Sequence, residues 1–187
     1  IIILWILRSL LQQRPGTLAS LYAQASDNWA IYLCKIELLM LTLQATGSYL
    51  ELVSPSWQYL TASILPGVAI IYRYWRQPTD SAVYSINWAI GLGTAEAVIL
   101  AGGSRLELAT ANIILGLATL FVSDWWLAQQ RREHILGSVE IMPLPYVLLG
   151  LGLRLGYFTN WTGLLTLGAA LTGIGVGRRR EEWKALT

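Results

Sequence analysis

The chain has almost none of the residues on which most metal, redox and hydrolytic sites are built. It contains one cysteine, Cys34, and one histidine, His134, among 187 residues. A single cysteine forms neither a disulfide nor a cysteine-based metal site within the chain. His134 falls in an arginine-rich connector, so a histidine-based metal site is not expected either. We therefore predict no metal site and no set of catalytic residues.

Charged residues are also scarce. They make up 13% of the chain, whereas hydrophobic residues make up 55%. In a soluble domain about a quarter of the residues are charged. The apolar residues form blocks of roughly 17–22 residues, the length that crosses about 30 Å of hydrocarbon. No charged start and no small-residue cleavage site mark a signal peptide. This composition predicts an integral membrane protein, with no nucleic acid as a partner.

Seven apolar segments predict an all-α, multi-pass transmembrane bundle of about six full helices and the end of a seventh. The segments are 1–11, 28–46, 57–73, 82–102, 108–128, 141–158 and 161–177. We expect the first to be the end of a helix that begins in a longer parent chain. Every connector except 12–27 is short, so consecutive helices should be antiparallel neighbours.

Basic residues predict the orientation. Nearly all of them outside the apolar segments fall on alternate connectors, namely Arg14, Arg73, Arg76, Arg131, Arg132, Arg178, Arg179, Arg180 and Lys184. Short cytoplasmic loops hold the excess of lysine and arginine. We expect these loops and the C-terminus on the cytoplasmic side of a plasma, inner or thylakoid-like internal membrane. The run Arg178, Arg179 and Arg180 could bind anionic lipid head groups, although a topology signal is the simpler interpretation.

Two stretches of the chain repeat each other. Asn28–Leu41 recurs as Asn87–Leu100 with Asn, Trp, Ala, Ile, Leu, Glu and Leu in register, and Thr61–Ala69 resembles Thr110–Ala118. A fainter third copy begins at Thr162. Such repeats predict stacked units that cannot bury their contact faces alone. We expect one membrane domain, 1–187, divided into the end of an earlier hairpin with its inner loop at 1–27 and two-helix hairpins at 28–77, 78–132 and 133–187, the last with a basic tail.

Two glutamates lie deep in the predicted helices. Glu37 and Glu96 occupy equivalent positions of the repeated motif, about 13 Å along each helix and close to mid-bilayer. A carboxylate at that depth is a functional hypothesis by default. One hypothesis makes both residues protonatable stations of an ion or proton path. The other makes each a packing device that bonds to a neighbouring hairpin, for example through Thr61, Thr94 or Thr110, and the repetition favours it.

The repeated motif also predicts which face of each helix is covered. Trp29, Leu33 and Glu37 follow one another at intervals of four residues, as do the equivalent residues of the second copy. Residues at this spacing lie on one helical stripe. We expect that stripe to face protein rather than lipid.

Two cations lie deep in the apolar segments. Arg154 lies mid-segment in 141–158, and an ion pair with Glu37 or Glu96 is one interpretation of it. Snorkelling to the membrane interface is the alternative, and it suits Lys35 better than Arg154.

Glycines are frequent where helices should meet. Two pairs have the spacing that lets helix backbones approach closely, and three further glycines recur at equivalent positions of the hairpins. The predicted packing positions are Gly67, Gly116, Gly152, Gly156, Gly168, Gly173 and Gly177.

Three functions fit these features. The chain is most simply a structural or accessory subunit that packs against other membrane-protein subunits, or against further repeats of the same chain, and against lipids. The first alternative is a secondary transporter or channel that uses Glu37, Glu96 and Arg154. The second is a membrane-embedded enzyme acting on lipid or glycan. No cofactor is indicated, lipid is expected, and a pigment remains open because carboxylates ligate magnesium in apolar surroundings and tryptophans pack against rings.

Overall fold

The computed structural model describes residues 2–13, 16–75, 78–129, 137–155 and 160–179. All regular structure within these ranges is helical, which confirms the predicted all-α class. The helices are α1 (Ile2–Gln12), α2 (Thr17–Tyr49), α3 (Trp57–Tyr74), α4 (Asp80–Leu100), α5 (Arg105–Gln129), α6 (Gly137–Ile141), α7 (Pro143–Leu153) and α8 (Thr162–Arg179).

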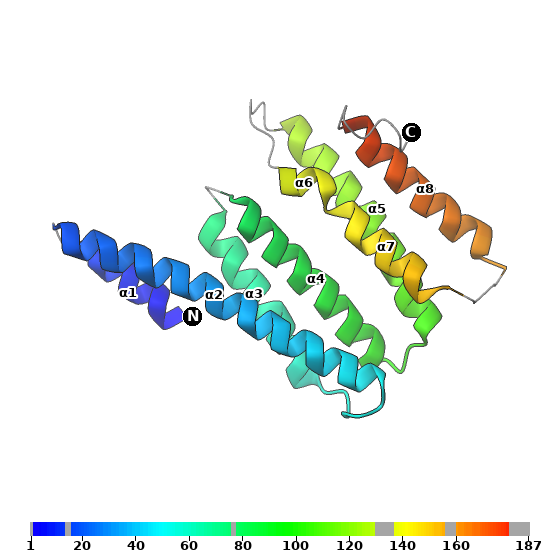
Figure 1. Ribbon diagram of the computed structural model, residues 1–187, viewed down its shortest axis with the longest axis horizontal. Helices are drawn as coiled ribbons and strands as arrows, with labels where there is room; N and C mark the ends of the chain where they lie inside the picture. Colours follow the sequence, from blue (N-terminus) through cyan, green and yellow to red (C-terminus); the bar gives the residue numbers. More distant parts are fainter. Residues whose placement is uncertain (1, 14–15, 76–77, 130–136, 156–159, 180–187) are drawn as a thin grey trace.

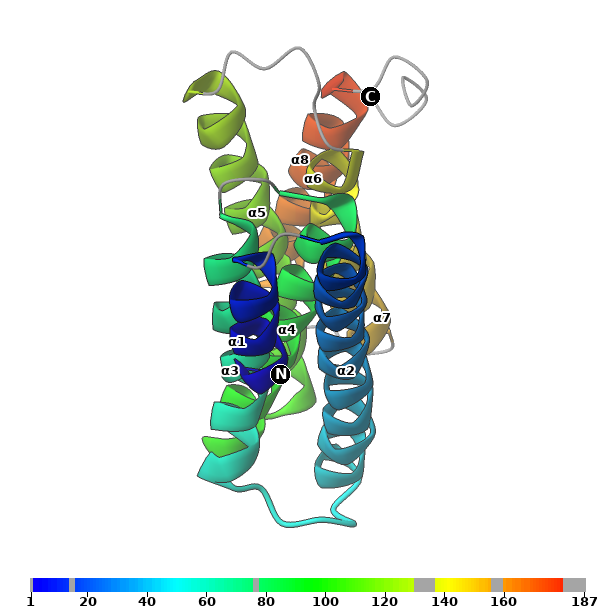
Figure 2. The same ribbon diagram turned by 90° about the vertical axis from the view of Figure 1, so that its left-hand side faces the viewer.

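The helices form an elongated bundle and pack in pairs (Figure 1). The most extensive contacts join α1 with α2, α3 with α4, and α5 with α7. α8 covers α5 and α7 at one edge, and α2 packs on α4. A view from the side shows α1 and α2 in front of α3 and α4 (Figure 2). The tightest pairs therefore cross the boundaries predicted between the hairpins, and the repeat itself stays a prediction.

Helix α2 is much longer than predicted. It contains 33 residues, about 50 Å of helix, and begins at Thr17 rather than near Asn28. The expected connector 12–27 is therefore wrong over most of its length. Its residues from Thr17 onward contain no glycine or proline, and the buried Ala23 and Ser26 lie on the α2 helix that packs against α1. Packing against α1 stabilises residues 17–27 as helix, although the stretch contains several polar residues.

Side-chain caps fix the starts of three helices. The Ser56 hydroxyl accepts from the amide of Gln58 at the start of α3, and the Thr79 hydroxyl accepts from the amide of Ala82 at the start of α4. At the start of α5, Ser104 and Glu107 bond to each other's backbone amides, which is a capping box. These local signals explain why the predicted boundaries of these helices agree with the structure to within about three residues.

Glycines allow three of the closest helix contacts. A Cβ added to Gly67 on α3 would lie 2.9 Å from the Cβ of Ala89 on α4. A Cβ added to Gly116 on α5 would lie 2.6 Å from Cγ2 of Val147 on α7, and one on Gly150 would lie 2.8 Å from a backbone oxygen of α5. Small residues at such crossings let backbones approach closely. Gly67 and Gly116, which the predicted repeat makes equivalent, meet α4 and α7, respectively.

The other predicted packing glycines divide into two groups. Gly168 is buried against Ile113 and Leu117 of α5, and Gly177 is buried as well. A Cβ added to Gly152 or Gly173 would meet nothing within 4 Å, so neither glycine packs closely against the part of the chain that the structure describes. Gly156 lies outside the described residues.

Three of the described helices combine the length and the apolar composition that a membrane span requires. They are Thr17–Tyr49, Asp80–Leu100 and Arg105–Trp125, in α2, α4 and α5. The apolar stretch Gly137–Leu153 is shorter. The structure thus supports membrane association, while the full number of spans and their sidedness stay predictions.

The predicted segment 141–158 is wrong in its bounds and in the place that it gives to Arg154. Helix α7 ends at Leu153, and Arg154 is its C-terminal cap, with its backbone amide bonded to carbonyls of the last turn. The guanidinium therefore belongs to a helix end rather than to the middle of a helix. Glycines at 150 and 152 weaken the helix just before this point.

Candidate functional site

Glu96 is the most deeply buried acidic residue described. Its side chain is 1% exposed, and neither carboxylate oxygen has a hydrogen-bond partner among the residues that the structure describes. It lies in the last third of α4, one turn beyond Leu92 and Gly93. Leu92 belongs to a core cluster with Leu38 and Ala45 of α2. A Cβ on Gly93 would touch Ser63 and Ile64 of α3, so the carboxyl lies near the junction of α2, α3 and α4.

The bonds that were predicted to lock Glu96 to a neighbouring hairpin are not formed. The hydroxyls of Thr61, Thr94 and Thr110 donate instead to carbonyls of their own helices. Threonine in a helix has such a carbonyl within reach one turn earlier, and this local bond competes with longer-range ones. The interpretation of Glu96 as a hydrogen-bonded packing device is therefore wrong for these three partners.

Glu37 does not share the environment of Glu96. It is only half-buried, and the neighbouring stripe residues Trp29 and Leu33 are 61% and 40% exposed. The buried face of α2 runs instead through Ala30, Cys34 and Leu38, one position along from the predicted stripe. The prediction that the stripe faces protein is thus wrong for the first copy. Small side chains at Ala30 and Cys34 let neighbouring helices approach, which the bulky stripe does not.

The predicted cations do not neutralise either glutamate. Lys35 is half-buried on α2. Arg154 is 7% exposed at the end of α7. Neither Glu37 nor Glu96 forms an ion pair with Arg154 in the part of the chain that the structure describes, so the predicted ion pair is not present. Helix α7, which ends just before Arg154, packs mainly against α5.

A charged cluster that the sequence did not reveal joins the first three helices. Arg73 of α3 donates to both oxygens of Asp27 on α2, at 3.0 Å from Nε and 2.7 Å from Nη2. Nε of Arg8 on α1 lies 3.7 Å from the same carboxylate. Burial and this carboxylate raise the pKa of Tyr74 above its usual value. Arg73 was interpreted only as an orientation signal, because residues 46 positions apart give no local pattern.

Of the arginines predicted to meet lipid head groups, the structure describes the side chain of one. Arg178 is exposed near the end of α8. Arg180 and the side chain of Arg179 lie outside the described residues.

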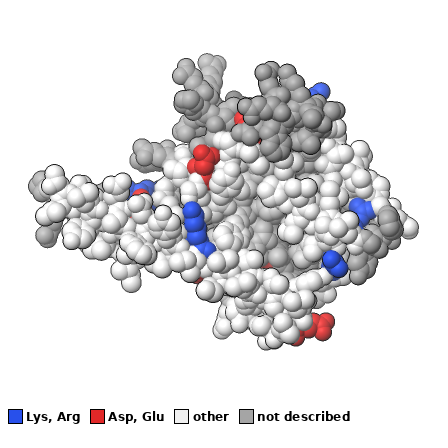
Figure 3. Space-filling model, in the orientation of Figure 1, with Lys and Arg blue, Asp and Glu red and all other residues white. Residues whose placement is uncertain are grey.

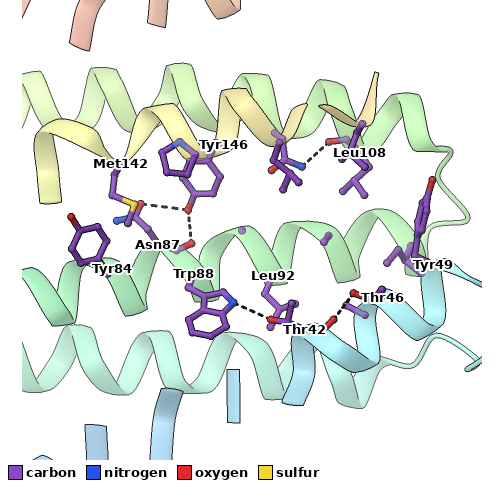
Figure 4. Close-up of a pocket in the computed structure, with 18 residues that line it drawn as sticks. Thr42, Thr46, Tyr49, Tyr84, Asn87, Trp88, Leu92, Leu108, Met142 and Tyr146 are labelled. Atoms are coloured by element: carbon purple, nitrogen blue, oxygen red, sulfur yellow. Dashed lines mark hydrogen bonds between the residues drawn. The ribbon is translucent and has the colours of Figure 1, made fainter. Parts of the chain in front are cut away.

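An apolar groove runs between α2 and α7, with α4 as its floor (Figure 4). Its volume is about 640 Å³. We call it the α2–α7 groove. The same face of the molecule, seen as a space-filling surface, carries few charged side chains (Figure 3). The lining residues are Thr42, Ala45, Thr46, Tyr49, Tyr84, Asn87, Trp88, Gly91, Leu92, Ala95, Ile99, Leu108, Asn112, Met142, Pro145, Tyr146, Leu149 and Leu153.

Several polar groups of the groove are already bonded within the protein (Figure 4). The Trp88 indole Nε1 donates to the hydroxyl of Thr42 at 2.9 Å. The Tyr146 hydroxyl donates to the backbone carbonyl of Asn87. Nδ2 of Asn112 donates to a carbonyl of its own helix. The groove therefore offers rings and aliphatic surface rather than free hydrogen-bond donors at these positions.

The described residues contain no group of three histidine, cysteine, aspartate or glutamate side chains placed to hold a metal ion. The sequence did not predict the groove, because its walls come from helices that are distant in the chain. Comparison with protein-family models, with curated proteins and with solved structures gives no match for this chain.

Proposed function

We propose that the chain is a non-catalytic integral membrane subunit that packs against another membrane protein through α8. The proposal includes tandem hairpins that cross the membrane repeatedly, with the arginine-rich connectors on the cytoplasmic side. One observation carries it: a stripe of small residues on α8 that no described part of the chain covers.

The α8 stripe consists of Gly163, Thr166, Ala170 and Gly173, which the helical period places on one face. Thr166 and Ala170 are exposed, and a Cβ added at either glycine would meet nothing within 4 Å. The opposite face, through Gly168 and Thr172, is buried in the bundle. α8 therefore has one face used by its own chain and one small-residue face that is open at the edge of the bundle (Figure 1).

Small residues matter in a membrane because lipid tails are as apolar as leucine. Helices there associate through close packing, and small residues allow their backbones to approach. The chain uses this device internally at Gly67 and Gly116, where α4 and α7, respectively, lie against the glycine. The α8 stripe offers the same kind of surface to a transmembrane helix of a partner subunit.

The test compares Gly173→Leu with Ala118→Leu, a matched control at an exposed small residue of α5 outside the stripe. Each protein is extracted in mild detergent, and the masses of its complexes are measured by native mass spectrometry. We expect the wild type and the control to retain a membrane partner that Gly173→Leu loses, with equal melting temperatures for all three. Wild-type protein recovered alone, or a partner retained equally by Gly173→Leu, would contradict the proposal.

The burial of Glu96 favours a second candidate function, a proton or ion path. A carboxyl without a partner at that depth is costly and is characteristic of such paths. Proton flux into liposomes that contain the wild type, and its loss in Glu96→Gln, would establish this function in place of the first. A proton flux equal to that of empty liposomes would exclude the proton or ion path.

A further inference from the structure

The cluster of Arg8, Asp27 and Arg73 has two guanidinium groups and one carboxylate, so it carries a net positive charge. The three side chains are 23%, 17% and 22% exposed, respectively. No other acidic side chain of the described residues forms an ion pair with either arginine. We propose that this cluster binds the phosphate group of an anionic phospholipid.

The two arginines use the carboxylate unequally. Arg73 donates to both oxygens of Asp27, at 3.0 Å from Nε and 2.7 Å from Nη2, and its Cζ lies 4.9 Å from the centre of the Tyr74 ring. Nε of Arg8 lies 3.7 Å from the same carboxylate, which is too far for a hydrogen bond. Arg8 has no hydrogen bond to any described residue, so its donors are available to a ligand.

A second donor lies beside Arg8. The indole Nε1 of Trp5 is buried and has no acceptor among the described residues. Trp5 comes three residues before Arg8 on α1, so the two side chains lie on the same face of the helix. Its ring packs on the core cluster of Cys34, Ile70 and Ala82. Buried N–H groups are nearly always hydrogen-bonded, so an orphaned donor next to an available guanidinium indicates a site for acceptor oxygens.

A phosphate group suits these donors. A buried charge is costly unless it is paired, and the carboxylate of Asp27 balances only one of the two arginines. A phosphate brings both the missing negative charge and several acceptor oxygens. Guanidinium groups bind phosphate through short, charge-assisted hydrogen bonds.

The surroundings of the cluster select a lipid over free phosphate. On α1, Ile3, Leu7 and Leu10 are 80%, 45% and 56% exposed, so a ligand with hydrocarbon tails can cover apolar surface that free phosphate leaves bare. This helix and the first half of α2 extend from one end of the bundle (Figure 1). Asp27 directly precedes the apolar segment 28–46, and Arg73 ends the segment 57–73. Charged side chains at the ends of apolar segments are placed to meet lipid head groups.

The test titrates purified protein in mild detergent with dioleoyl phosphatidylglycerol, which is anionic, or dioleoyl phosphatidylcholine, which is zwitterionic, and measures bound lipid by native mass spectrometry. Arg8→Met removes the available cation. Lys35→Met is the matched control, because it removes one positive charge from a half-buried position of α2 outside the cluster. We expect the wild type and Lys35→Met to bind phosphatidylglycerol about tenfold more tightly than phosphatidylcholine, and Arg8→Met to lose this preference.

A milder variant, Trp5→Phe, keeps an aromatic ring and removes the indole N–H, so it tests the site if circular dichroism shows that Arg8→Met does not fold. We expect it to bind phosphatidylglycerol about two- to tenfold more weakly than the wild type.

Equal affinity of the wild type for the two lipids would overturn the proposal, as would an unchanged affinity for phosphatidylglycerol in Trp5→Phe and in folded Arg8→Met. An equal loss in Lys35→Met would reduce the effect to net charge and overturn it as well. Inorganic phosphate that binds the wild type more tightly than phosphatidylglycerol would overturn the assignment to a lipid. The α8 stripe shares no residue with this cluster, so neither result bears on the proposed subunit contact.

Discussion

Replacing Glu96 by methionine should stabilise the protein. The side chain is 1% exposed, and both carboxylate oxygens are without a hydrogen bond to any described residue. Burial of a polar group without a partner costs about 1–3 kcal/mol by mutational measurements. Methionine has a similar length and no such cost, so we expect Glu96→Met to raise the free energy of unfolding by about 1–3 kcal/mol.

The assay is thermal unfolding in mild detergent, followed by circular dichroism. For a chain of this size each kcal/mol corresponds to about 2–4 °C in melting temperature. Glu37→Met is the matched control, because Glu37 holds the equivalent position of the repeated motif and is only half-buried. We expect its melting temperature to change by no more than the equivalent of about 0.5 kcal/mol.

The opposite result would refute this reasoning in an informative way. If Glu96→Met lowers stability by more than about 1 kcal/mol while Glu96→Gln does not, the carboxyl makes a native hydrogen bond of ordinary strength. The candidate partner is Oε1 of Gln44 on α2, which is also buried without a hydrogen bond. Such a bond requires the protonated acid as donor, and Gln44→Leu should then cost a similar amount and show coupling to Glu96→Met.

Three further perturbations test the packing. Asp27→Asn should lower the free energy of unfolding by about 1–3 kcal/mol, because it weakens the two-point bond between Asp27 and Arg73, whose side chains are 17% and 22% exposed. A double-mutant cycle with Arg73→Met, measured by chemical unfolding, gives the coupling energy of the pair. Additive effects of the two substitutions would contradict this prediction. Gly116→Leu should lower the free energy of unfolding by about 3 kcal/mol or more, because its Cβ would lie 2.6 Å from Cγ2 of Val147. Gly152→Leu is the control and should be near neutral, because a Cβ there would meet nothing within 4 Å. Equal melting temperatures for the two variants would refute the close contact at Gly116. Trp88→Phe should cost less than about 1 kcal/mol, the value of its single hydrogen bond at a partly exposed site, and a larger loss in thermal unfolding would mean that the ring supports the bundle.

Residue type and local spacing determined much of the helical framework. The apolar segments at 57–73, 82–102, 108–128 and 161–177 correspond to α3, α4, α5 and α8. The length of an apolar run and the residues that cap a helix are local features, so they can be recognised directly in the sequence. The predicted bounds of α2 and α7 were wrong because the signals there are weaker. Residues 17–27 gain their helicity in α2 from packing against α1, and before the end of α7 at Leu153 there is no proline, only the weakening glycines at 150 and 152.

The sequence alone determined that this is an apolar, all-helical chain with glutamates in its helices, because hydrophobic content and helical period are properties of neighbouring residues. Only the tertiary structure decided that Glu96 is buried without a hydrogen-bond partner among the described residues, while Glu37 is half-exposed. It also decided that Arg154, at the end of α7, forms an ion pair with neither glutamate in that part of the chain. It also decided that α2, α4 and α7 together enclose a groove. Burial, pairing and cavities depend on which helices become neighbours, and that choice is made by contacts between residues far apart in the chain.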